Sequence, residues 1–342
     1  MKATEGYIVY LNKHAPSNTG IFNLVKFAGK ADMVFLNWIE NLPEKKAGWL
    51  QTVFFLIFLR IRKWVGIKVV WTLHNKISHS ARQRYLKEIL FNNLLKYSDL
   101  IITHSHEGVR FASEKYPQAS SRLFFFPHPV TPANGNQQPE KKEYDILIWG
   151  TMAPYKGIDT FLEYLEQQDA LSRYRILIAG KAGTPEFFQK INQYSSPVIT
   201  IKNQFIDPGE LSQMIARSTI VLFTYSGASV LSSGALMDSI SNRAYVVGPH
   251  VGAFAEMADL GIIQTYHDFN ELQTILDASK SNFPIVTARE VEKFIREHTW
   301  PEFGKALQHR VIGLLEYVKD QKGRFRRGTS SAPRLMPEKS NH

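Results

Sequence analysis

The chain has 342 residues, which is long for a single hydrophobic core and suits two α/β domains. Hydrophobic residues make up 44% and charged residues 21%, a composition that excludes a disordered chain. Because there is no cysteine, disulfides, thiolate metal sites and a cysteine nucleophile are also excluded. The net charge of +10 favours an anionic partner such as nucleic acid, acidic lipid or a phosphorylated substrate.

Both ends of the chain are polar. The first six residues lack the apolar core of a signal peptide, so we expect a cytoplasmic protein. Residues 321–342 contain Lys322, Arg324, Arg326 and Arg327, followed by a stretch rich in Gly, Ser and Pro. This composition predicts a disordered basic tail, which could bind an anionic surface or be solvated and without function.

Short apolar runs alternate with helical stretches, such as residues 82–95, in the first part of the chain. Runs of this length, rich in β-branched and aromatic residues, are typical of strands buried on both faces. The alternation predicts a parallel sheet covered by helices on both faces. The predicted strands are residues 7–11, 33–36, 68–72, 100–103 and 123–126.

Residues 131–143 interrupt the alternation, and their Pro, Asn, Gln, Gly and Lys predict a linker. The alternation then starts again, so we expect two α/β domains, at residues 1–135 and 136–299. Such domains bind ligands at the carboxyl ends of their strands, which predicts a cleft between them. In the second domain the predicted strands are 144–149, 175–179, 220–223 and 244–247, and the predicted helices are 158–167, 186–194, 208–216, 234–241 and 271–279.

Residues 49–64 form an unusually apolar segment that becomes basic after Leu59 and has tryptophan at both ends. The segment is shorter than the roughly 20 apolar residues of a membrane span. Two interpretations remain open. The helix could lie in a membrane interface with Trp, Arg and Lys among the head groups, or it could be buried inside the domain.

Two loops that follow predicted strands have residue types suited to a diphosphate. In the first, Gly150 and Thr151 follow a strand, and Lys156 precedes a helix whose N–H groups also favour an anion. A plain turn would explain the Lys-Gly pair equally well. In the second loop, hydroxyls and amides are suited to binding phosphate or sugar oxygens. Alternatively, Ser233 could simply cap a helix. The second-loop candidates are Tyr225, Ser229, Ser233 and Gly234.

Several histidines follow predicted strands of the first domain, at the edge where ligands bind. His74 and Asn75 directly follow one strand, and His79 lies a few residues further on. His104 follows another strand, and His128 lies just before the linker. These side chains could bind sugar hydroxyls or steady a leaving phosphate, or they could bond the backbone of their own loops.

Together these segments resemble bacterial family 4 glycosyltransferases of the polysaccharide-biosynthesis branch. The similarity includes residues 71–79 and 126–129 in the first half and 154–157, 225–234, 243–247 and 251–256 in the second. It covers about residues 30 to 300, and the combination is more specific than any one motif. The chain departs from the wider family at Val230 and Asp238, which replace its two Glu residues, and at Thr151, Thr219 and Arg243.

The resemblance implies the GT-B fold, an α/β architecture of two facing Rossmann-like domains with an interdomain cleft. It also implies transfer of a sugar, with retention, from a UDP- or GDP-linked donor to a lipid-linked oligosaccharide or polysaccharide acceptor. Lys156 and His74 would be catalytic, with the donor held mainly by the second domain. A helix at 300–320 would cross back onto the first domain. The expected location is the inner face of the plasma membrane, on an anionic surface.

The absence of several common motifs narrows the possible cofactors and partners. There is no Asp-x-Asp, no dinucleotide-binding glycine motif and no P-loop, so we expect no metal and no cofactor. Lys156 and helix N-termini would then neutralise the leaving diphosphate. The replaced Glu pair leaves open a non-catalytic GT-B-like protein that binds nucleotide-sugar or partner enzymes. Nucleic acid is not expected as a partner, because no recognition helix or aromatic base-binding motif is present.

Overall fold

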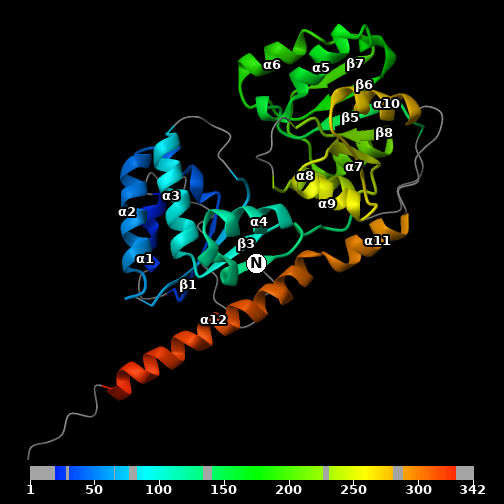
Figure 1. Ribbon diagram of the computed structural model, residues 1–342. Coiled ribbons are helices and arrows are strands. Elements are labelled where there is room, and N and C mark those ends of the chain that lie inside the picture. Colours follow the sequence, from blue (N-terminus) through cyan, green and yellow to red (C-terminus); the bar gives the residue numbers. More distant parts are fainter. Residues whose placement is uncertain are drawn as a thin grey trace, which may run out of the picture.

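The computed structural model describes residues 20–27, 31–64, 66–76, 83–133, 141–225, 231–279 and 288–328. Within these residues the chain forms two parallel β-sheets, each with helices packed against it (Figure 1). The four-stranded sheet belongs to the first part of the chain and the six-stranded sheet to the second. The strand predicted at residues 7–11 lies outside the described residues.

The first sheet has the order β1-β2-β3-β4, and all neighbouring strands are parallel. Its centre is dry, because Trp71 and Leu73 on β2 are wholly inaccessible to solvent. Parallel neighbours need crossover connections, and helices supply them here. The strands are β1 (Met33–Asn37), β2 (Lys68–Leu73), β3 (Leu100–Thr103) and β4 (Leu123–Phe125); the helices are η1 (Gly20–Asn23), α1 (Leu24–Phe27), η2 (Ile39–Glu44), α2 (Gly48–Ile61), α3 (Arg84–Tyr97), α4 (His106–Lys115) and η3 (Pro117–Arg122).

The second sheet has the order β10-β9-β8-β5-β6-β7. The chain builds outward from β5 in both directions, so the topological switch point lies between β5 and β8, where such folds bind ligands. The strands are β5 (Tyr144–Trp149), β6 (Ile176–Ala179), β7 (Ile199–Lys202), β8 (Ser218–Leu222), β9 (Val246–Pro249) and β10 (Gln264–Tyr266); the helices are η4 (Pro154–Lys156), α5 (Ile158–Gln167), η5 (Leu171–Arg173), α6 (Pro185–Asn192), α7 (Pro208–Ala216), α8 (Gly234–Ser241), α9 (Gly252–Asp259), α10 (Phe269–Ser279) and α11 (Ala288–Glu297).

A long helix, α12 (Trp300–Gly328), begins beside α11 and runs along the first domain (Figure 1). Phe303, Ala306, Leu307 and Leu314 of α12 pack against a buried cluster from β2, β3 and β4. At the crossing, the Val130 N–H donates to the His298 carbonyl oxygen at 2.8 Å. The helix continues to Gly328, so the expectation of a disordered tail from residue 321 is wrong for residues 321–328. No proline occurs after Pro301 within the helix, although Gly304 and Gly313 lie inside it.

A buried charge network holds α2 to the amino edge of the first sheet. Arg62 is 2% exposed, pairs with Asp99, and donates to the carbonyl oxygens of Ile67 and Tyr97. Asp99 also accepts a hydrogen bond from the Val69 N–H at 2.8 Å. A buried charge is costly unless it is paired and hydrogen-bonded, so this network fixes where α2 ends relative to β2 and β3.

Most predicted elements of the second domain are confirmed, with α5, α7 and α8 at their predicted bounds. Two strands and two α-helices of this domain were not predicted, and neither was α4 of the first domain. β7 and β10 are short edge strands with polar residues, so their alternation is weak. α4, α9 and α11 are short helices of eight to ten residues, for which periodicity is a weak guide.

Removal of α12 should damage the first domain. A chain ending at Thr299 loses the Phe303 and Leu307 side chains that cover the sheet, so apolar surface of β2 to β4 becomes exposed to water. We expect an unfolding transition of the first domain that is lowered or lost, measured by calorimetry. A chain ending at Gly328 is the control and should melt as the full chain does. Equal melting of both truncated chains would contradict the role of α12.

Candidate active site

The carboxyl ends of the two sheets face each other across a pair of reciprocal hydrogen-bonded contacts. Glu107 on α4 accepts from the Gly252 N–H, the first residue of α9, at 2.7 Å. Glu256 on α9 accepts from the His106 N–H, the first residue of α4, at 2.5 Å. Each carboxylate therefore lies at the positive end of the other helix, which is a favourable position. Because α4 follows β3 and α9 follows β9, the loops at both carboxyl edges meet here.

The loop after β5 presents Lys156 at this edge. Gly150 has φ +101, a conformation that favours glycine, and an added Cβ would lie 3.1 Å from the Lys156 Nζ. Lys156 ends η4, and Gly157 caps the start of α5. The Thr224 hydroxyl, just after β8, donates to the Lys156 carbonyl oxygen at 2.6 Å. The loops after β5 and β8 are thus joined at the topological switch point.

The Lys156 side chain is a buried cation that forms no ion pair with any described acidic residue. It is 7% exposed, and its Nζ lies 4.9 Å from the centroid of the Tyr225 ring. Within the described part of the chain, no carboxylate forms an ion pair with it. A cation over an aromatic face gains some energy, but a buried charge without an anion remains costly. The arrangement therefore suits an anionic ligand.

The second predicted loop is partly described. Tyr225 is buried and its hydroxyl lies 3.1 Å from the Ser233 Oγ, while Ser233 caps α8 by accepting from the Leu236 N–H. The capping interpretation of Ser233 is thus confirmed, and its hydroxyl is not free to serve a ligand alone. Gly234 borders open space, because nothing lies within 4 Å of an added Cβ. Thr151 is exposed, and Ser229 lies outside the described residues.

The predicted side chains of the first domain gather at the ends of neighbouring strands. His74 follows β2, His104 follows β3 and His128 follows β4, with ring centroids 6.2 Å apart for the first pair and 5.1 Å for the second. His128 bonds the carbonyl oxygen of Pro129 in its own loop, as the simpler interpretation predicted, whereas His104 bonds that of Phe126, after the neighbouring strand. Asn75 is half-buried beside His74. His79 lies outside the described residues.

Sequence reasoning missed Trp38, which follows β1 and stacks on His74 at 4.1 Å with an interplanar angle of 5°. Trp38 is 51% exposed and has φ +55, in the left-handed region where side chains other than glycine are disfavoured. An exposed tryptophan directly after a predicted strand could have drawn attention, but its stacking on His74 is a tertiary contact that the sequence does not reveal.

The three clustered histidines are neutral at physiological pH. Burial, together with a smaller repulsion by His128, lowers the pKa of His74 to about 4 and that of His104 to about 3. Burial also lowers the pKa of His128. His74 can therefore donate or accept a hydrogen bond but does not supply positive charge near pH 7. The cation of the site is Lys156, on the opposite domain.

Asp238 stands where the resembling family has the second of its Glu residues. It lies on α8, and desolvation by the surrounding protein raises the pKa of its carboxyl. Among the described residues, no group of three or more His, Asp or Glu side chains is arranged to hold a metal ion.

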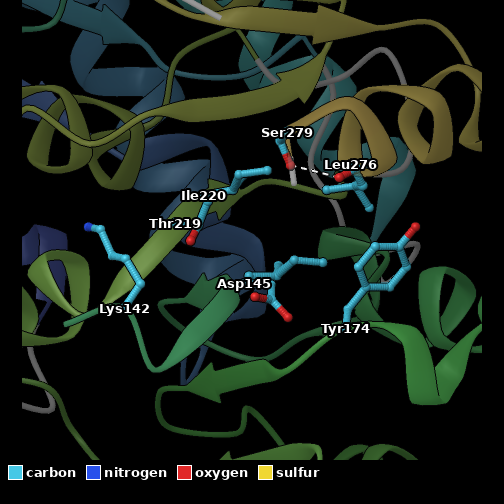
Figure 2. Close-up of a pocket in the computed structure, with 8 residues that line it drawn as sticks. Lys142, Asp145, Tyr174, Thr219, Ile220, Leu276 and Ser279 are labelled. Atoms are coloured by element: carbon cyan, nitrogen blue, oxygen red, sulfur yellow. Dashed lines mark hydrogen bonds between the residues drawn. The ribbon is translucent and has the colours of Figure 1, made fainter. Parts of the chain in front are cut away.

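A cavity of about 300 Å³ opens at the other edge of the second sheet (Figure 2). It lies at the amino ends of β5 and β8, away from the loops described above. Asp145 pairs with Arg175, Tyr174 donates to Asp277, and Lys142 donates to two backbone carbonyls. Since these polar groups already have partners in the protein, we do not place the ligand site there.

No family model matches the chain, and no curated protein matches it by sequence. Solved structures do match. HepE from Anabaena, in complex with UDP and glucose, superposes with a TM-score of 0.59 at 13% identity, over 90% of this chain and 85% of that one. TarM from S. aureus, in a complex that includes UDP, gives a TM-score of 0.60 at 12% identity, over 86% and 57% of the chains.

The catalytic domain of starch synthase IV from Arabidopsis thaliana, bound to ADP and acarbose, gives a TM-score of 0.53 at 13% identity, over 86% of this chain and 75% of that one. Identities this low show the fold alone. The chain has the GT-B fold, as predicted: two facing Rossmann-like α/β domains.

The buried histidines should make the protein sensitive to acid. In the unfolded chain they bind protons near pH 6.5, whereas folded His104 does so only near pH 3, so protonation favours unfolding as pH falls through this range. The free energy of unfolding should fall by up to about 1.4 kcal/mol per pH unit for each such histidine. Urea titrations at pH 7, 6 and 5 measure this slope. His104→Asn should reduce the slope, and an unchanged slope would contradict the assignment.

Proposed function

We propose that the protein is a glycosyltransferase that moves a sugar from a nucleotide-diphosphate-sugar to a lipid-linked or polysaccharide acceptor. The proposed reaction retains the anomeric configuration and needs no metal. In this proposal residues 136–299 bind the UDP- or GDP-linked donor and residues 1–135 bind the acceptor. The fold supports this division, because the loops at its two carboxyl edges meet at the Glu107 and Glu256 contacts.

One observation carries the proposal: a buried lysine without an acidic partner, at the topological switch point and before the start of α5. A diphosphate is the ligand that this combination fits best, because it brings the missing negative charge to the ammonium and to the helix N–H groups. As the bond to the sugar breaks, charge builds on the leaving diphosphate, and a preorganised cation stabilises that charge. HepE and TarM with UDP, and starch synthase IV with ADP, support a nucleoside diphosphate.

The proposed roles of the other site residues follow from their positions in the fold. Gly150 allows close approach of the backbone, and Gly234 borders the open space at the start of α8. His74, near the transferred sugar, acts as a neutral hydrogen-bonding group rather than as a charged acid. The proposed donor side consists of Gly150, Thr151, Lys156, Tyr225, Ser229, Ser233 and Gly234, and the proposed acceptor side of His74, Asn75, His79, His104 and His128.

A second candidate function is binding without transfer. It is favoured by Val230, which replaces a Glu of the resembling family, and by Asp238, which is shorter than the other Glu. Such a protein would bind a nucleotide-sugar or partner enzymes of a polysaccharide assembly system. Donor binding without nucleotide release, in the presence of acceptor extracts, would identify it.

Lys156→Ala should lower kcat by roughly 10²- to 10³-fold, or about 2.7–4 kcal/mol of barrier, because one charge contact to the leaving group is lost. The melting temperature should not fall, since an unpaired buried cation is itself destabilising. The measurement is nucleotide release from a panel of UDP- and GDP-sugars. Lys293→Ala, which alters an exposed lysine on α11, is the control. Normal turnover by Lys156→Ala would contradict the diphosphate assignment.

We also propose that α2 holds the protein on an anionic membrane. Its inner face is buried through Phe55, Phe58 and Leu59, and its outer face exposes an apolar stripe. Of the nearby cations, Arg60 and Lys63 are exposed, whereas Arg62 is buried with Asp99 and cannot reach lipid. No helix in the described part of the chain is long and apolar enough to cross a membrane. The stripe comprises Trp49, Leu50, Val53, Ile57, Ile61 and Trp64.

Binding to anionic vesicles should depend both on the apolar stripe of this face and on the exposed cations Arg60 and Lys63. Ile57→Glu together with Trp64→Glu should abolish sedimentation with phosphatidylglycerol vesicles, because charge is placed where apolar contact is needed. Arg60→Gln with Lys63→Gln should weaken it, most clearly at low salt. Tyr85→Glu, on α3, is the exposed aromatic control. If the unaltered protein does not sediment with these vesicles, the membrane proposal fails.

A further inference from the structure

A row of five aromatic rings lines the carboxyl edge of the first sheet. Trp38 stacks on His74 at 4.1 Å, and His74 lies 6.2 Å from His104. His104 lies 5.1 Å from His128, and His128 lies 5.9 Å from Trp300. These distances are measured between ring centroids. We call Trp38, His74, His104, His128 and Trp300 the ring row.

The ring row crosses the whole width of the sheet. Its first four members follow β1, β2, β3 and β4 in turn, and Trp300 begins α12. Because the strands are ordered β1-β2-β3-β4, the rings follow one another along a single edge. This edge faces the second domain, since His104 lies just before the start of α4, where Glu256 of α9 binds. The ring row therefore lies on the edge of the first sheet that the α4–α9 contacts join to the second domain.

The two ends of the row are open to solvent. Trp38 is 51% exposed and Trp300 is 46% exposed, although both rings are apolar. Trp38 also adopts a left-handed backbone conformation with φ +55, which costs energy for a residue with a side chain. Strain of this kind is concentrated at ligand sites. A smaller residue would fit the backbone better, so the requirement is for the tryptophan ring itself.

Two of the three histidines between the tryptophans leave Nε2 as a hydrogen-bond acceptor, whereas the His74 Nε2 lies 3.3 Å from the Asn37 Oδ1 and donates to it. The His104 Nδ1 lies 2.8 Å from the Phe126 carbonyl oxygen, and the His128 Nδ1 lies 3.1 Å from the Pro129 carbonyl oxygen. A carbonyl oxygen only accepts, so in each neutral ring Nδ1 carries the proton and Nε2 is left as an acceptor. Hydroxyl groups are the matching donors. None of the five rings is a cation at neutral pH.

We propose that the ring row binds the acceptor, and that the acceptor end bound there is a neutral oligosaccharide chain rather than a lipid phosphate. Sugar rings have apolar C–H faces that pack on aromatic rings and hydroxyl edges that donate to imidazole nitrogen. A phosphate would need a cation, which the row lacks. This inference rests on the proposed function, because it assigns the acceptor of that transfer.

The direct test is ¹⁹F NMR of protein labelled with 5-fluorotryptophan, whose resonances are assigned with single Trp→Phe variants. The probes are cellotetraose, maltotetraose and chitotetraose, with a short-chain prenyl phosphate as the rival ligand. We expect at least one tetrasaccharide to shift the Trp38 and Trp300 resonances while those of Trp49 on α2 and of Trp64, just after α2, stay in place. Shifts with prenyl phosphate alone, or with none of the probes, would overturn the proposal.

Variants separate a binding role from a structural one. Trp38→Gly should lower affinity for the shifted tetrasaccharide at least tenfold while the melting temperature is maintained, because glycine relieves the backbone strain. Trp38→Phe should recover part of the affinity, and Tyr85→Gly, an exposed aromatic residue on α3, should change nothing. Unchanged tetrasaccharide affinity in Trp38→Gly would refute the assignment.

UDP binding, measured in parallel, distinguishes the two proposals. Trp38→Gly should bind UDP as the unaltered protein does, because the nucleotide is assigned to the second domain. Failure of the unaltered protein to bind either UDP or GDP would refute the donor site. Normal nucleotide binding with no tetrasaccharide response at Trp38 and Trp300 would refute the ring row alone.

Discussion

A buried ammonium without a carboxylate is the constraint around which the second domain is arranged. Lys156 is enclosed by the Tyr225 ring on one side and by Gly150, which has no side chain, on another. The Thr224 hydroxyl donates to the Lys156 carbonyl oxygen, so a hydrogen bond joins the loops after β5 and β8. Lys156 and these neighbours lie at the topological switch point of the second sheet, between β5 and β8. The domain thus carries an electrostatic cost that only an anionic ligand offsets.

The two sides of the site differ in their chemistry. The second domain supplies a cation and helix N-termini, whereas the first supplies aromatic rings and neutral imidazoles whose pKa values are lowered by burial. Glu107 and Glu256 hold the sides together, each at the start of the other domain's helix. A charged donor and an uncharged acceptor would accordingly bind on opposite faces of one site.

The sequence predicts the architecture well, because buried parallel strands leave continuous apolar runs such as those of β5 and β8. It also predicts that His74 directly follows such a run and that Lys156 lies in the loop after another. It does not predict the edge strands β7 and β10, whose residues are largely polar. Nor does it predict the Trp38 stack on His74 or the Glu107 and Glu256 contacts, which join residues distant along the chain. Arg62, basic and apparently exposed in the sequence, is buried because Asp99 lies beside it.

The central claim is that Lys156 binds the diphosphate of the donor. Isothermal titration calorimetry with UDP, UMP and uridine, and with the matching guanosine series, tests it directly. We expect the diphosphate of one series to bind at least tenfold more tightly than its nucleoside. Lys156→Met should abolish this difference while nucleoside binding is retained. Equal affinity for nucleoside and diphosphate, or an undiminished preference in Lys156→Met, would contradict it.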